Sequence, residues 1–222
     1  KRNSKQKRLI FTSDLKKAVS QSDIIFICVG TPTKKNTNSA DLKYVFKVVH
    51  ELKKIISKYK IIVTKSTVPV TTGDKIEKIL FKLKKKNLVD VVSNPEFLRE
   101  GEAISDFSRP DRVIIGTNSK KANSKMKSLY MPIIKKNSRY FNTSRRGAEL
   151  IKYASNAFLA TKISYINELA NLCEKVGVDI KDISQGMGSD LRIGERFLRA
   201  GPAYGGSCFP KDTRALINIG NH

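Results

Sequence analysis

The chain has 222 residues, of which 40% are hydrophobic, enough to build the core of one large or two small domains and too many for a disordered chain. It carries 43 lysines and arginines against 20 aspartates and glutamates, a formal net charge of +23. The lysines are spread along the whole length, without zinc-finger spacing, an RNA-binding aromatic motif or a basic heptad region. We therefore interpret the charge as a solvated lysine surface and expect no nucleic-acid partner.

Cysteine usage and hydropathy indicate the compartment. Cys28, Cys173 and Cys208 are odd in number and lack metal-ligand spacing, which predicts neither a disulfide framework nor a metal site. Reduced thiols suit the cytosol. No stretch approaches the roughly 18 apolar residues of a membrane-spanning helix, and the basic start is not followed by a signal-peptide core. We expect a cytoplasmic protein that binds no membrane.

Short apolar runs alternate with helical patterns through about the first 120 residues, which predicts an α/β fold with a parallel sheet of Rossmann type. The first residues are expected to include the helix that precedes a strand of this sheet. Strands are predicted at 22–30, 60–66, 88–94 and 112–117, and helices at 40–59, 73–86 and 119–131. Turn residues follow each strand, as GTPTKK, STVPVT, SNPEF and GTNS. Ligands bind at such carboxyl ends of strands in open α/β sheets.

Beyond an extended piece around Tyr140, one helical period runs without interruption from Arg146 to about Val176. This is too long for a crossover helix, and we interpret it as the spine of a second, all-helical region that ends in the glycine-rich loop RAGPAYGGSCFPKD. The predicted domains are a partial Rossmann-type domain at 1–142 and a central helical domain at 143–222. Because no G-x-G-x-x-G turn is present, we expect the chain to begin inside the dinucleotide-binding domain.

The motif GGSCFPKD at 205–212 is the sharpest chemical signal. Pro210 suits the first turn of a helix, so Cys208 is predicted to lie just before a helix N-terminus. The positive end of that helix would lower the pKa of the thiol and favour the nucleophilic thiolate. Asp212 would lie one turn further on. Spacing alone also allows the simpler interpretation of a buried loop cysteine.

Two other groups could take part in such chemistry. Lys152 and Asn156 share one helix face with Ala160, and their neighbours are mostly apolar or small, which favours a partly buried ammonium that stabilises negative charge. Glu96 and Glu100 lie in the turn NPEFLREG at a strand end, where a carboxylate could position water or act as a base. The alternatives are a solvent-exposed lysine and ordinary helix-start glutamates.

Seven motifs in order resemble the UDP-glucose 6-dehydrogenases of the UDP-glucose/GDP-mannose dehydrogenase family. They are GTPT at 30–33, STVP at 66–69, NPEFLREG at 94–101, PDRVIIG at 110–116, KYASNAFLATKISYINE at 152–168, RIG at 192–194 and GGSCFPKD at 205–212. The resemblance extends from about residue 8 to the end. It also implies that the family's glycine-rich turn and C-terminal UDP-binding domain lie outside this chain, so we expect the chain to be inactive alone.

The resemblance implies a four-electron oxidation of a sugar C6 alcohol to a carboxylate by two NAD⁺ in succession, through a cysteine thiohemiacetal and thioester. Cys208 would be the nucleophile and Lys152 would stabilise the oxyanions. Asp212, with Thr67 and a water, would move protons, and Glu96 would act in the hydrolytic step. The catalytic residues so implied are Cys208, Lys152, Asp212, Glu96, Thr67 and Asn156.

The same resemblance implies binding residues. Those for NAD are Val29, Gly30, Thr31, Pro32, Thr33, Ser66, Thr67, Val68, Glu100 and Lys211. Those for the nucleotide sugar are Glu96, Phe97, Leu98, Lys152, Asn156, Arg192, Phe197, Leu198, Arg199, Tyr204 and Gly205. Arg192 resembles an arginine that reaches a neighbouring subunit's substrate, which implies a homodimer or higher homo-oligomer through the central helix. Cys28 and Cys173 match no catalytic position and are expected in the core.

Three alternatives stay open. A sister dehydrogenase that acts on GDP-mannose or a UDP-N-acetylhexosamine would share the cysteine chemistry, although the loop around Cys208 is most similar to the UDP-glucose branch. A non-catalytic remnant could serve as a binding or oligomerisation module, against which the joint presence of Cys208, Lys152, Asp212 and Glu96 argues. A basic nucleic-acid binder would show tight, steeply salt-dependent duplex binding.

Overall fold

The computed structural model describes residues 2–34, 37, 39–81, 88–134 and 138–220. They form two compact units. The first comprises the described residues of Lys1–Thr31, Leu42–Thr67 and Thr71–Ala148, and the second those of Pro32–Asp41, Val68–Val70 and Glu149–His222.

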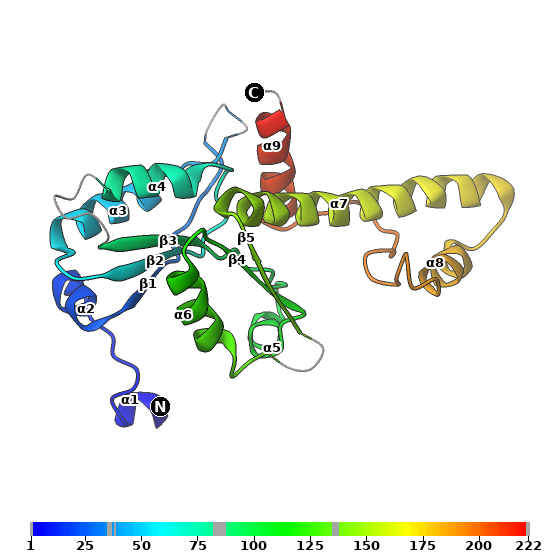
Figure 1. The fold of residues 1–222 in the computed structure, drawn as a ribbon. Coiled ribbons are helices and arrows are strands. Elements are labelled where there is room, and N and C mark those ends of the chain that lie inside the picture. Colours follow the sequence, from blue (N-terminus) through cyan, green and yellow to red (C-terminus); the bar gives the residue numbers. More distant parts are fainter. Residues whose placement is uncertain (1, 35–36, 38, 82–87, 135–137, 221–222) are drawn as a thin grey trace. The chain divides into compact units, whose positions relative to one another are not determined.

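The first unit is built on a five-stranded sheet with the strands in chain order (Figure 1). The strands are β1 (Ile24–Ile27), β2 (Lys60–Thr64), β3 (Val89–Ser93), β4 (Arg112–Gly116) and β5 (Arg139–Thr143). β1, β2 and β3 are parallel to one another, as are β4 and β5. β3 and β4 are antiparallel and pair only at Ser93 and Gly116. The α/β class is confirmed, and the predicted parallel sheet contains one antiparallel junction, where only the short helix α5 (Ala103–Ser108) separates the strands.

Helices cover both faces of this sheet (Figure 1). α3 (Lys43–Ile55) and α4 (Thr72–Leu80) lie on one face and α6 (Lys120–Tyr130) on the other. The expected helix before the first strand is α2 (Leu15–Gln21), which Asp14 caps by accepting from the Lys17 backbone N–H. The short helices α1 (Arg2–Lys5) and α5 were not predicted. Part of the helix predicted at 73–86 falls at 82–86, outside the described residues.

The core of the first unit lies on both faces of the strands. Side chains of β2, β3 and β4 pack with one face of α6 in a cluster of Ile61, Val63, Val92, Val113, Ile115, Ala122, Met126 and Tyr130. Ile62 and Val91 alternate with these residues along their strands, so they face the opposite side, and both are buried. Strands buried on both faces read as continuous apolar runs, which is why the sequence located them.

The expectation that both spare cysteines are core residues is half right. Cys173 is buried, but Cys28 is exposed. β1 ends at Ile27, so Cys28 lies beyond the last paired residue of an edge strand. The apolar run continues past the end of the ladder, and the pattern alone could not locate that end.

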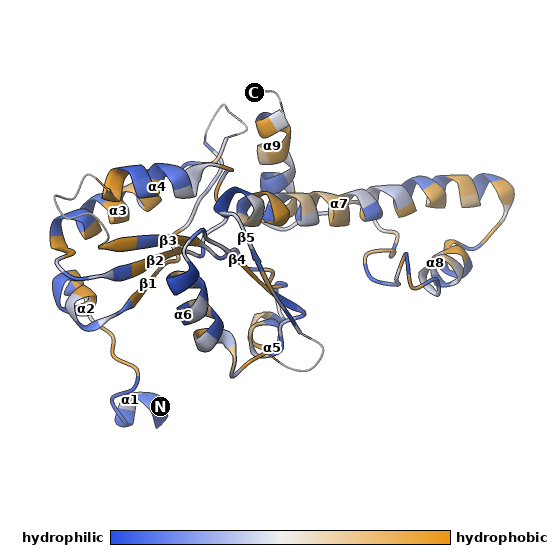
Figure 2. Cartoon of the chain, in the orientation of Figure 1, coloured by the Kyte–Doolittle hydropathy of each residue, from blue (hydrophilic) through white to orange (hydrophobic). Residues whose placement is uncertain are grey.

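The second unit is helical. It contains most of α7 (Arg145–Val176), together with α8 (Ile180–Gly188) and α9 (Phe209–Gly220). The predicted uninterrupted helix is confirmed, and Figure 2 shows apolar and polar residues interspersed along it. Gly177, with φ of 70°, ends α7 in the left-handed conformation that favours glycine, and the Val178 N–H returns to the Cys173 carbonyl. None of the described helices is long and apolar enough to cross a membrane.

Candidate active site

The thiol of Cys208 lies at the start of a helix, as the sequence predicted. α9 begins at Phe209, with Pro210 in its first turn, and the Asp212 N–H donates to the Cys208 carbonyl over 2.9 Å. The side chain of Cys208 is half-buried, and the Ser207 hydroxyl lies 3.7 Å from its sulfur. The helix places its unpaired N–H groups and positive end beside this sulfur.

Asp212 is the buried anion of the site, with 1% of its surface exposed. The Asn156 side-chain amide of α7 donates to its Oδ2 over 2.6 Å, and the Lys211 ammonium lies 2.5 Å from its Oδ1. Each carboxylate oxygen therefore has a donor, which offsets the cost of burying the charge. The structure brings Asn156 and Asp212 together, and it adds Lys211, which the resemblance had assigned to the cofactor.

One face of α7 carries the other buried polar groups. Lys152 is 3% exposed and Asn156 is 7% exposed, which confirms the expectation of a buried lysine on the face shared with Ala160. Glu149, 3% exposed, lies on the same face and was not singled out from the sequence. The spacing of three and four residues from Glu149 to Lys152 and Tyr153 was the available signal for it.

Tyr153 is fully buried on this face, beside Lys152 in the chain. Burial raises the pKa of its phenol, and the negative charges of Asp212 and Glu149 raise that pKa further. Among the residues that the structure describes, none forms a hydrogen bond with its hydroxyl. Sequence reasoning treated Tyr153 only as an apolar neighbour of Lys152.

The loop before Cys208 is shaped by aromatic rings and backbone contacts. Phe197 adopts the left-handed conformation, with φ of 68°, a strained backbone for a bulky residue. Its ring lies edge-on to Phe209 with centroids 6.0 Å apart, and Tyr204 approaches Phe209 similarly at 6.3 Å. Leu198 is 2% exposed, so its side chain belongs to the core, and its carbonyl accepts from Ser184 over 2.6 Å.

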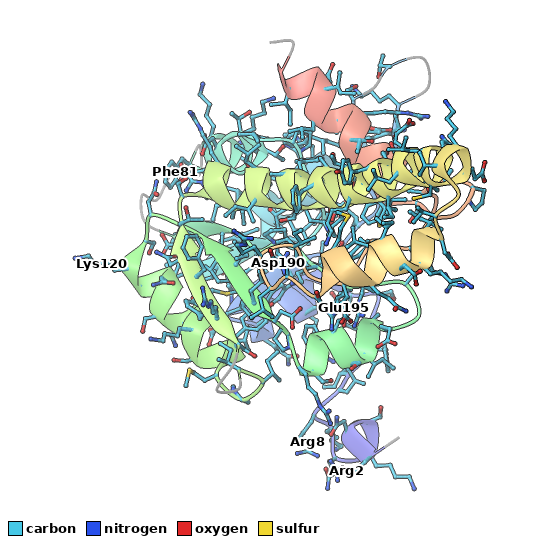
Figure 3. All side chains as sticks on the ribbon, turned by 90° about the vertical axis from the view of Figure 1, so that its right-hand side faces the viewer. Arg2, Arg8, Phe81, Lys120, Asp190 and Glu195 are labelled. Carbon is cyan, nitrogen blue, oxygen red and sulfur yellow. The ribbon has the colours of Figure 1, made fainter. Side chains whose placement is uncertain are left out.

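The remaining predicted sugar contacts of this unit are open to solvent. Arg199 and Gly205 are exposed. Arg192, with 89% of its side chain exposed, pairs with Asp190 over 2.6 Å. The Lys162 ammonium holds this turn by donating to the carbonyls of Ile193 and Gly194. Asp190 and Glu195, which lie on either side of the turn, are labelled in Figure 3.

In the first unit, two of the loops predicted to bind NAD are tied together at the ends of β1 and β2. The Ser66 hydroxyl donates to the Val29 carbonyl over 2.7 Å, and the Thr31 hydroxyl donates to the Thr67 carbonyl over 2.8 Å. Gly30 is exposed, and a Cβ added there would meet no atom within 4 Å. The other segment residues, Pro32, Thr33 and Val68, belong to the second unit, where Thr33 bridges Ala40 and Val68 is buried.

The turn after β3 is held by its own side chains. Glu96 accepts the Leu98 backbone N–H over 2.8 Å, and the Phe97 ring lies 4.1 Å from the Arg112 guanidinium. Burial lowers the pKa of Arg112. Leu98 and Glu100 are exposed.

Asn94, which begins the NPEFLREG motif, has a structural place that the sequence did not predict. It is 1% exposed, its amide donates to the Ile114 carbonyl, and its oxygen accepts the Tyr130 hydroxyl over 2.5 Å. Asn94 therefore fixes where the turn leaves the sheet. Over the described part of the chain, no three His, Cys, Asp or Glu side chains form a group able to hold a metal ion.

Comparison with known proteins identifies the family. Residues 1–134 match the NAD binding domain of the UDP-glucose/GDP-mannose dehydrogenase family, and residues 146–222 match the central domain of the same family. The chain belongs to the UDP-glucose/GDP-mannose dehydrogenase family, and its N-terminal part is the family's NAD-binding domain.

Individual relatives of the chain belong to the same class of dehydrogenase. The chain is 53% identical over 212 residues to a UDP-glucose 6-dehydrogenase of Rhizobium meliloti (strain 1021), covering 95% of this chain and 48% of that protein. It is similar to the structure of a UDP-glucose dehydrogenase from Pyrobaculum islandicum, with a TM-score of 0.91, 39% identity and coverage of 99% and 51%. It is also similar to the structure of a GDP-mannose dehydrogenase from Pseudomonas aeruginosa, with a TM-score of 0.80, 34% identity and coverage of 99% and 52%. The chain spans about half the length of the curated relatives it matches.

Proposed function

We propose that this protein is an NAD-dependent UDP-glucose 6-dehydrogenase, which oxidises the C6 alcohol of UDP-glucose to the carboxylate of UDP-glucuronate. The observation that carries the proposal is the arrangement around α9. A cysteine precedes the helix, and one turn later the buried Asp212 is bonded to Asn156 of the helix face that also holds Lys152. Nucleophile, carboxylate and buried cation are the groups that an aldehyde oxidation through a thioester needs.

Cys208 explains how one site oxidises twice. After a hydride and a proton leave the C6 alcohol, the thiolate adds to the aldehyde carbon, and the aldehyde oxygen takes up a proton, which completes the thiohemiacetal. Loss of a second hydride, and of the hydroxyl proton, converts the thiohemiacetal into a thioester. Water then attacks the thioester, the carbon–sulfur bond breaks, and the thiolate returns as the carboxylate forms.

The buried groups have roles that follow from their charge. The ammonium of Lys152 stabilises the negative oxygen of the tetrahedral adducts, and its burial strengthens the attraction. Asp212, which Asn156 holds, accepts and returns the protons of the alcohol and the attacking water, together with Thr67. Glu96 acts in the hydrolytic step and also contacts the sugar, as Phe97, Leu98, Asn156, Tyr204 and the loop 197–205 do.

The residues at the ends of β1 and β2 fit NAD. Gly30 offers open backbone, and the Ser66 and Thr31 hydroxyls hold the two loops in register. We assign the cofactor to Val29–Thr33, Ser66–Val68, Glu100 and Lys211, whose ammonium has donors left beyond its bond to Asp212. When bound, NAD⁺ accepts the hydride that leaves C6. The domain boundary that we infer lies near residue 142, between the two matched family domains.

We also infer a homodimer through α7. Large apolar side chains recur on its exposed side at intervals of seven or eight residues, Leu150, Phe158, Tyr165 and Leu172, each 43–65% exposed. A stripe at this spacing suits helix-to-helix packing between copies. Exposed Arg192 would then be available to a neighbouring subunit's substrate. The cytoplasmic location stays a prediction.

The test is the stoichiometry of NADH formed from UDP-glucose by the full-length protein, beside its Cys208→Ser variant. Two NADH per UDP-glucose, with net turnover lost in the variant, are expected. GDP-mannose and UDP-N-acetylglucosamine are assayed in parallel, because the sister dehydrogenases share the cysteine chemistry. NADH from one of these sugars and none from UDP-glucose would reassign the substrate. No NADH from any of the three would refute the proposal.

A further inference from the structure

The hydroxyl of Tyr153 has no role in the reaction outlined above. The residue is fully buried on the face of α7 that holds Lys152 and Asn156. Within the described residues, its hydroxyl has no hydrogen-bond partner. An unsatisfied buried hydroxyl is costly, so such groups in native proteins normally bond to a nearby acceptor or to an ordered water.

Two buried carboxylates lie within electrostatic reach of this phenol. Asp212 and Glu149 are 1% and 3% exposed, and both raise the pKa of Tyr153 beyond the effect of burial, Asp212 more strongly. Asp212 is bonded to Asn156, which lies three residues after Tyr153 and therefore on the same side of α7. The Asn156 bond therefore ties the carboxylate of Asp212 to the side of α7 on which the Tyr153 side chain is buried.

Asp212 can accept a further bond. Its Oδ2 accepts from Asn156 and its Oδ1 from Lys211, and each ionised oxygen offers two lone-pair sites. Lys211 is the weaker constraint, because its long side chain has many rotamers and is 21% exposed. A donor on a rigid, buried ring would fix the plane of the carboxylate with less loss of conformational entropy.

We propose that the Tyr153 hydroxyl is a positioning group for the Asp212 carboxylate, to which it donates a hydrogen bond through one buried water. This inference rests on the proposed role of Asp212 in proton transfer. Tyr153 has no assigned contact with the substrate, so in this proposal it acts through Asp212, whose carboxylate it holds in place.

The test is the variant Tyr153→Phe in the full-length protein, with Tyr44→Phe as the matched control. Tyr44 lies on α3, outside the site and the proposed dimer stripe, and is 52% exposed. Loss of a hydrogen bond to a charged group is expected to lower kcat about tenfold or more and leave KM for UDP-glucose unchanged. The control is expected to leave both constants unchanged. A merely structural tyrosine would lower the melting temperature without lowering kcat of the folded protein, and that result would overturn the proposal.

A crystal structure that resolves ordered waters gives a readout independent of activity. The Tyr153 oxygen should lie within hydrogen-bond distance of a water that also contacts the Asp212 carboxylate. If the phenol instead bonds only to Glu149, the proposal is wrong. A protein that shows the contact but oxidises no nucleotide sugar would refute the proposed function and the catalytic part of this inference, and leave the hydrogen bond established.

Discussion

Removing the guanidinium of Arg145 should destabilise the first unit far more than removing that of its neighbour Arg146. Arg145 begins α7, is 8% exposed in its side chain, and donates four hydrogen bonds to Asp74 and Glu77 of α4, at 2.6–3.2 Å. Arg146 is 65% exposed and donates one bond of 2.6 Å to Asp74. The two arginines therefore differ in burial and geometry, but they share an acceptor.

The magnitude follows from what each deletion leaves behind. Breaking a fully buried ion pair costs about 3–5 kcal/mol, because a charge is left without water or partner. The side chains of Asp74 and Glu77 are 30% and 28% exposed and can partly rehydrate, so we expect about 2 kcal/mol for Arg145→Ala. For Arg146→Ala we expect below about 0.5 kcal/mol, as for other exposed pairs.

Urea unfolding followed by circular dichroism measures both losses. Burial alone would raise the pKa of Asp74, but hydrogen bonds from Arg146 and Arg145 outweigh it and hold that pKa below its ordinary value. A lowered pKa contributes stability above the unfolded-state value near 3.8, and this contribution is lost as pH falls through the folded-state value. The gap between wild type and Arg145→Ala should therefore narrow below pH 4. Equal losses in the two alanine variants at pH 7 would refute the reasoning.

Three further changes test the packing and the site. Gly116→Ala should lower the free energy of unfolding in urea by at least about 2 kcal/mol, because its Cβ would lie 2.6–2.8 Å from atoms of Ala148, Ser144 and Arg145. The Cβ of Gly186→Ala would meet no atom within 4 Å, so this variant should not be destabilised. Similar losses in the two variants would contradict this reasoning. Asn156→Asp replaces the amide that donates to Asp212 over 2.6 Å by a second carboxylate, so the pair should retain a proton and its pKa should rise. The free energy of unfolding should therefore fall by roughly 3 kcal/mol at pH 8, and this loss should shrink as pH falls. A loss that does not depend on pH would show that the two carboxylates lie apart. Phe158→Lys on the exposed stripe should convert the proposed dimer to a monomer in analytical ultracentrifugation at micromolar concentration, whereas Lys175→Ala should not. A dimer that persists in Phe158→Lys would place the interface elsewhere.

Much of the local structure could be predicted from the sequence because the relevant signals are local. Strands buried on both faces are continuous apolar runs, so β2 and β3 were located closely. The helical pattern that predicts α7 depends only on residues three and four apart, and the predicted helix, Arg146 to about Val176, differs from the observed one by one residue at its start. Pro210 placed the helix start after Cys208, because proline suits a first turn.

Features that depend on which surfaces meet were decided only by the tertiary structure. Nothing local indicates that β4 runs antiparallel to β3, because strand direction depends on the path of the connection between them. Cys28 is exposed because the sheet ladder ends one residue before it, which the apolar run does not mark. The buried set around Asp212 forms only when α9 packs on α7, since its residues are 56 positions apart in the chain. The sequence by itself determined most of the elements and the place of Cys208 before a helix, and the packing of α9 on α7 decided which charges surround Asp212, because burial and pairing are properties of contacts between distant segments.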